Sequence, residues 1–101
     1  MGQRLDLQSK LEELLGARHV YYMPPENMKL EYPAIVYAKN KIDTDKADNS
    51  TYKKSTQYTV TVVDRMPDND VIEKLMKIPY CSFDRHYVSK NLNHDVLTLY
   101  Y

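Results

Sequence analysis

The side chains with the most evident chemical potential lie near the C-terminal end of the sequence. Cys81, Asp84 and His86 fall in one segment, and His94 and Asp95 follow shortly after it. Two histidines with one or two aspartates are donors that bind transition metals, and a thiol beside an imidazole resembles a nucleophile with its base. Their spacing matches no established ligand set, and a lone cysteine on a strand is generally a small buried apolar residue. We therefore expect these residues to be structural, with no catalytic residue, no metal site and no cofactor.

A small hydrolase or metalloprotein that uses Asp84, His86 and His94 is an alternative to this expectation. If the segments 80–88 and 94–101 pair as a hairpin, the two histidines could lie near each other. The rest of the composition gives an enzyme little support. The chain has two glycines, too few for a glycine-rich phosphate loop or nucleophile elbow.

The overall composition is that of one folded domain. Hydrophobic residues make up 43% and charged residues 28% of the 101 residues. The formal net charge is zero, which argues against a dedicated binder of nucleic acid or anionic membranes. A single cysteine excludes an internal disulfide and fits synthesis in a reducing cytoplasm. No apolar run approaches the ~20 residues needed to cross a bilayer, so we expect no membrane partner.

Tyrosine is the unusual residue of this chain, with ten copies against one phenylalanine and no tryptophan. Tyrosine supplies apolar area with a polar tip and is enriched at protein interfaces. Adjacent residues of a strand face opposite sides, as Tyr21 with Tyr22 and Tyr100 with Tyr101 would. Helices cover one face of a single sheet, so some rings are expected on the other face as a subunit interface. The alternative is a partly hydrated sheet face without a partner.

The spacing of apolar residues predicts two helices. One covers Leu7 to Leu15, with Asp6 as its N-cap and Gly16 as its stop, and the other lies between Asp70 and Pro79. β-forming residues and turn signals predict the strands His19–Met23 (at an edge), Tyr32–Ile42, Ser55–Asp64, Tyr80–Val88 and His94–Tyr101. The order α-β-β-β-α-β-β predicts a single α+β domain over residues 1–101. We expect a two-layer sandwich with a mostly antiparallel sheet of about five strands.

The segment from Asp43 to Lys54 is almost entirely polar, and we expect it to be a long loop. We expect the loop to be mobile in the free subunit and to become ordered against a partner, because one aromatic residue beside charges is typical of contacts made on binding. A hairpin tip without a role is the alternative. The resulting assembly-interface candidates are Asp43, Asp45, Asp48, Tyr52, Lys53, Lys54, Tyr21 and Tyr100.

Several stretches resemble a family of small proteins from long-tailed bacteriophages and prophages. The stretches are Leu11–Gly16, Val20–Pro25, Tyr32–Tyr37, Tyr58–Arg65, Phe83–Tyr87 and Asn91–Asp95. Taken together they resemble the tail terminator, or tail completion, proteins of the phage neck. The shared residues are strand and turn residues rather than catalytic signatures, and the resemblance transfers no catalytic residue.

The resemblance implies a structural protein of the virion rather than an enzyme. Such proteins form a hexameric ring on the last ring of the tail tube, stop tube polymerisation and join the tail to the head connector. It thus implies as partners further copies of the chain, the tail tube protein and the head-completion protein, with DNA passing through the ring without sequence-specific binding. A head-closure or minor capsid neck protein, and a small nucleic-acid-associated prophage protein, are the alternatives.

Overall fold

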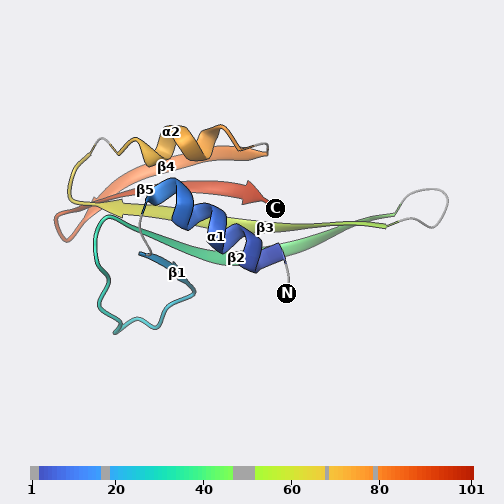
Figure 1. Cartoon of the computed structure of the whole chain (residues 1–101), viewed down its shortest axis with the longest axis horizontal. Helices are drawn as coiled ribbons and strands as arrows, with labels where there is room; N and C mark the ends of the chain where they lie inside the picture. Colours follow the sequence, from blue (N-terminus) through green and yellow to red (C-terminus); the bar gives the residue numbers. More distant parts are fainter. Residues whose placement is uncertain (1–2, 17–18, 47–51, 68, 79) are drawn as a thin grey trace.

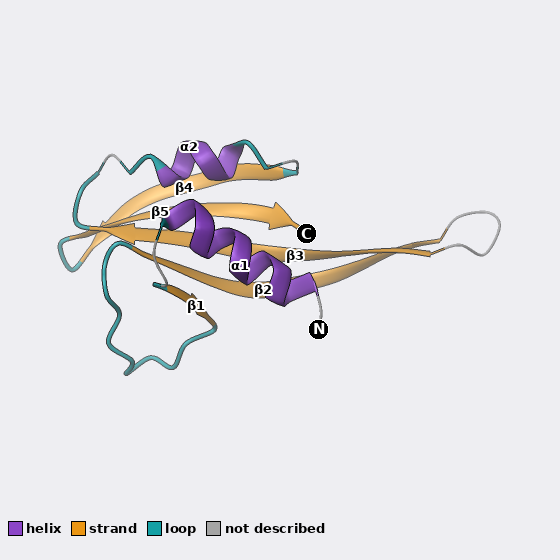
Figure 2. Cartoon of the chain, viewed as in Figure 1, coloured by secondary structure: helices purple, strands orange, loops and turns teal. Residues whose placement is uncertain are grey.

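The computed structural model describes residues 3–16, 19–46, 52–67, 69–78 and 80–101. The elements follow the predicted order, and the fold is of the predicted α+β class, with an open five-stranded sheet (Figures 1 and 2). Their bounds are α1 Gln3–Leu15, β1 Val20–Tyr22, β2 Ala34–Lys46, β3 Tyr52–Asp64, α2 Val71–Met76, β4 Cys81–Ser89 and β5 Leu92–Tyr100.

The strand order in the sheet is β1-β2-β3-β5-β4, so β3 is central and β1 and β4 are the edges. The edge position predicted for the first strand is confirmed. It pairs in parallel with β2, while all other pairs are antiparallel. The register places Tyr37 opposite Val60, and Val60 opposite Leu97. Since directly opposite residues share a face, this row defines one side of the sheet.

Both described helices pack on the side of the sheet that carries Val60 (Figure 2). Every second residue of β3 points to this side, where Tyr58, Val60 and Val62 are almost fully buried. Burial of each large apolar side chain contributes roughly 1.5–3 kcal/mol, which makes this layer the main source of stability. The other core residues are Leu7, Leu11, Val20, Ile35, Tyr37, Val71, Leu75, Ile78, Leu97 and Leu99.

The ends of α1 show one confirmed and one wrong prediction. The helix begins at Gln3, so Asp6 lies inside its first turn instead of capping it. The preceding residues include Arg4 and Leu5, both good helix formers, which allows the helix to start earlier. Gly16 ends the helix as predicted, because its positive φ of 78° reverses the chain and its N–H donates to the Glu12 carbonyl at 2.9 Å.

The prediction of an unstructured loop from Asp43 to Lys54 is wrong for most of that segment. Strand β2 continues to Lys46 and β3 begins at Tyr52, with Asp43 paired to Ser55 and Thr44 to Lys54. Polar composition did not prevent pairing, because a two-stranded ribbon hydrogen-bonds its backbone without needing a core. Residues 47–51, including Asp48, lie outside the described part of the chain.

The paired strands β2 and β3 extend past the rest of the sheet and form an arm. The last pair between β3 and β5 is Gln57 with Tyr100, whereas β2 and β3 continue to pair as far as Lys46 with Tyr52. Figure 1 shows this hairpin projecting from one end of the body, and the molecule measures 51 × 23 × 22 Å. We call residues 42–46 and 52–56 the hairpin arm.

Shortening the arm tests whether it belongs to the stable core. In the test variant, Asn-Gly replaces residues 44–54, so that the turn joins the paired Asp43 and Ser55. Because only β2 and β3 pair along the arm, with no third strand beyond Gln57 and Tyr100, we expect the free energy of unfolding to change by less than about 1 kcal/mol. Urea denaturation followed by circular dichroism measures this change. A loss of several kcal/mol would contradict a peripheral arm.

Candidate assembly surface

The side of the sheet opposite the helices carries a mixture of aromatic, polar and aliphatic residues, many of them half-buried, and we call it the open face. The register places on this face the cross-strand row Tyr21, Val36, Thr61 and Val96 and the row Ala38, Thr59 and Thr98. No described helix packs on it (Figure 2). Other members of the open face are Asn40, Gln57, Asp84, Arg85, Tyr87, His94 and Tyr100, and three aliphatic residues of this face, Ala34, Val63 and Val96, are buried.

Hydrogen bonds fix the side chains at the end of the open face nearest the hairpin arm. The Gln57 amide donates to the Tyr100 hydroxyl at 2.6 Å, and Asn40 donates to the Gln57 oxygen at 3.2 Å and to Thr59. This network spans three strands and orients the Tyr100 ring without burying it. A rigid, half-exposed tyrosine loses little conformational entropy when a partner covers it, and it is therefore well suited to an interface.

A second aromatic group lies on the part of the open face formed by β4 and β5. The Tyr87 and His94 rings stack with their centroids 4.6 Å apart and their planes 7° from parallel. The Arg85 guanidinium lies 5.7 Å from the centre of the Tyr87 ring, within cation–π range. Sequence reasoning treated His94 as a potential ligand and did not predict this group. The cross-strand pairing of Tyr87 with His94 would have indicated it.

Two predicted interface residues, Tyr21 and Tyr100, both lie on the open face but do not form one site. Tyr21 is on β1 and Tyr100 on β5, three strand spacings apart, or roughly 14 Å at the usual spacing. The Tyr21 hydroxyl accepts a hydrogen bond from the Glu31 N–H at 3.3 Å. The two rings therefore occupy separate parts of a broad surface.

The remaining predicted interface residues belong to the hairpin segment. Asp45 pairs with Lys53, Thr44 with Lys54 and Lys46 with Tyr52 along the two strands, with Asp43 nearer the body. Only the backbone of this part is described, and Asp48 lies outside the described residues. The structure thus separates the candidates into an arm group and an open-face group.

The polar cluster from the sequence is divided between the two faces of the sheet. His86 pairs with Asp95 on the helix-covered face, where His86 Nδ1 lies 2.7 Å from Asp95 Oδ1. His94 lies on the opposite face, so the two histidines point apart. Among the described residues, no three His, Cys, Asp or Glu side chains come close enough to hold a metal ion. The expected hairpin between β4 and β5 is present, but it places the two histidines on opposite faces of the sheet.

Cys81 is the first residue of β4 and lies on the covered face opposite Leu99, away from the His86–Asp95 pair. Partial burial, aided by the Asp84 carboxylate, raises the pKa of its thiol above the ordinary value. A raised pKa lowers the thiolate fraction at neutral pH, the opposite of what activates a nucleophilic cysteine. This environment fits a packing role for Cys81.

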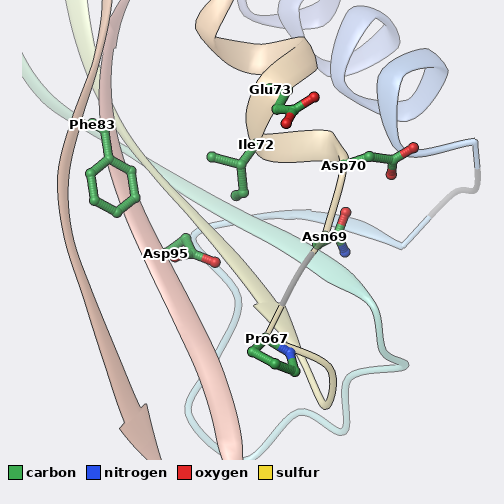
Figure 3. Close-up of a pocket in the computed structure, with 7 residues that line it drawn as sticks. All are labelled: Pro67, Asn69, Asp70, Ile72, Glu73, Phe83 and Asp95. Atoms are coloured by element: carbon green, nitrogen blue, oxygen red, sulfur yellow. The ribbon is translucent and has the colours of Figure 1, made fainter.

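A groove of about 480 Å³ lies between α2 and the β4–β5 hairpin (Figure 3). Its lining combines apolar side chains, Ile72 and Phe83, with the carboxylates of Asp70, Glu73 and Asp95. The Asp95 carboxylate contacts the His86 imidazole, and the Asp70 carboxylate lies 3.8 Å from the Lys74 ammonium group. The groove therefore contains no described pair of free acid and base, and we assign it no reaction.

Comparison with known proteins adds no family to this description. No protein-family model and no curated protein sequence matches the chain. In the described part of the chain, no helix is long and apolar enough to span a membrane.

Some tyrosines belong to the core. The sequence did not distinguish these buried tyrosines from those at the surface. Tyr37 and Tyr58 are almost fully buried, with ring centroids 5.9 Å apart. The Tyr37 hydroxyl donates to Gln8 and accepts from Arg4 at 3.4 Å. Burial raises the pKa of both phenols above the ordinary value, and for Tyr37 the Arg4 contact opposes the effect.

Alkaline titration tests the burial of Tyr58. Because its pKa is raised in the folded state, its contribution to stability is complete below the unfolded-state pKa of about 10 and is lost as pH rises beyond it. We expect tyrosinate absorbance to show a late step, which Tyr58→Phe reduces and the exposed-site control Tyr80→Phe leaves in place. Unchanged titration in Tyr58→Phe would contradict the assignment.

Removal of His86 tests whether the His86–Asp95 pair is structural. The Asp95 side chain is 12% exposed, so His86→Ala leaves a nearly buried carboxylate without this partner. We expect a loss of about 1–3 kcal/mol in the free energy of unfolding. His94→Ala, which removes a side chain from the open face, should cost less. A stoichiometric metal that is present in the wild type and lost when His86→Ala and His94→Ala are combined would contradict a structural role.

Proposed function

We propose that the chain is a structural protein of a phage virion that caps the tail tube as a ring, stops tube polymerisation and joins the tail to the head connector. The observation that carries the proposal is the open face, a broad sheet surface with oriented tyrosines and no described helix over it. Such a surface fits a protein that acts by assembly. The resemblance to tail terminator proteins supplies the particular assembly.

A ring needs two different contact surfaces on each subunit, because its contacts are head-to-tail and must close. The open face and the hairpin arm meet this need, since the arm projects from one end of the body while the open face covers one side (Figure 1). An isolated two-stranded ribbon is marginally stable in water, so contact with a neighbour would stabilise the arm. We propose six copies, with the tail tube protein and the head-completion protein as the axial partners.

DNA would pass through this ring without being read. The zero net charge supports this part of the proposal, because sequence-independent DNA binders rely on an excess of lysine and arginine. Retention on DNA that decreases steeply with salt would instead favour a nucleic-acid-associated protein. The proposed location is the neck of the virion, with synthesis in the bacterial cytoplasm.

Electron microscopy of purified tail tubes mixed with the protein tests the proposal. We expect wild type to form a ring at the tube end and to stop elongation. Thr61→Lys places a charge at the centre of the open face, and we expect it to fold but to leave most tubes uncapped. Glu73→Lys, an exposed change on α2, is the matched control and should cap normally. Normal capping by Thr61→Lys would contradict the role of the open face, and absence of any wild-type ring would contradict the function.

A further inference from the structure

Strand β4 is a long edge strand with no described neighbour on its outer side. It has nine residues, and all of them after Cys81 are exposed. The other edge, β1, has only three residues. Figure 1 shows β4 along the upper margin of the sheet. An unpaired edge of this length is a template for another extended strand.

A β-bulge gives β4 an unusual symmetry. Phe83 pairs with Leu97 and Arg85 with Val96, so Asp84 is the extra residue. The Asp84 carboxylate accepts a hydrogen bond from Thr98 at 2.7 Å, which places it on the open face together with Arg85. Phe83 and His86 both lie on the covered face. In both directions from the Asp84–Arg85 bond, successive side chains therefore alternate between the open face and the covered face in the same order.

We propose that two free copies pair through antiparallel β4 strands, with a two-fold axis at the Asp84–Arg85 bond. In this register every pair of opposite residues shares a face, which a regular strand centred between two residues cannot achieve. The pairs, each of which occurs twice, are Asp84 with Arg85, Phe83 with His86, Ser82 with Tyr87, and Cys81 with Val88.

Charge complementarity selects a second copy of this chain as the partner. In the proposed register Asp84 of each copy faces Arg85 of the other, giving two reciprocal pairs on the open face. A shift of one residue would place Arg85 against Arg85 or Asp84 against Asp84, and like charges directly opposite are destabilising. The pairing also covers apolar residues exposed in the single chain, Val88 at 63% and Phe83 at 43%.

The contact has the form of a continuous ten-stranded sheet. Eight paired residues span about 25 Å, and the two-fold axis is perpendicular to the sheet, so both open faces point the same way. A single ladder of this length is a small interface, and we expect a dimer that dissociates readily. This inference concerns the free protein and does not depend on the proposed function.

Reciprocal charge reversal tests the register directly. Asp84→Arg and Arg85→Asp are made separately, and each variant alone then opposes like charges in a pair with itself. An equimolar mixture of the two restores opposite charges in both pairs. Sedimentation equilibrium measures association, circular dichroism confirms folding, and Glu13→Arg on α1 is the control for a charge change far from β4.

We expect wild type and Glu13→Arg to dimerise equally, each β4 variant alone to dissociate at least about tenfold more readily, and the mixture to recover wild-type association as a heterodimer. Wild type that stays monomeric at every accessible concentration would overturn the proposal. So would single variants that associate like wild type, or a mixture that fails to recover. A variant that does not fold is replaced by the milder pair Asp84→Lys and Arg85→Glu, judged by the same outcomes.

Discussion

The structure depends on the alternation of side chains along the central strand β3. Tyr58, Val60 and Val62 point to one side and are buried, while Gln57, Thr59 and Thr61 point to the other. β3 contacts both β2 and β5, so its alternation sets the faces of the whole sheet through the register. A shift of one residue in either pairing would move threonines into the core. The position of both helices follows from this one pattern.

The helices are small relative to the sheet, and this determines what is left uncovered. Leu7 and Leu11 of α1 and Val71 and Leu75 of α2 fill the covered side of the body. Beyond Gln57 and Tyr100 there is no third strand, and the hairpin arm continues alone. The tyrosines are used accordingly. Tyr37 and Tyr58 fill space in the core, whereas Tyr87 and Tyr100 are held at the surface by a stacked ring and a hydrogen bond.

The sequence predicted the element order because strong local signals mark each element: helical leucine spacing, β-branched runs and prolines. It predicted the Asp43–Lys54 segment wrongly, since polar composition indicates the lack of a core but not the lack of a backbone ladder. The parallel pairing of β1 and the β5–β4 order depend on long-range contacts without a local signal. The bulge at Asp84 also has no local signal in the sequence, and it determines which residues of β5 pair with Cys81, Ser82 and Phe83. The pairing of His86 with Asp95 instead of His94 follows from the two-residue turn between Ser89 and Leu92, which sets the register of this end of the hairpin.

Three features are left without a partner in the described chain: the open face, the hairpin arm and the β4 edge. They differ in the symmetry they allow. The proposed β4 contact is isologous, so it ends at two copies, and both open faces and both arms stay accessible in the pair. The proposed ring is head-to-tail and requires unlike surfaces to meet. A β4 pair therefore cannot extend into a ring by repeating itself. If the ring contacts use the β4 edge, the free dimer occupies the same edge, so that pairing and ring formation exclude each other and the dimer delays ring closure. If the ring does not use the β4 edge, β4 pairs can also persist after ring assembly, provided that neighbouring subunits leave these edges accessible.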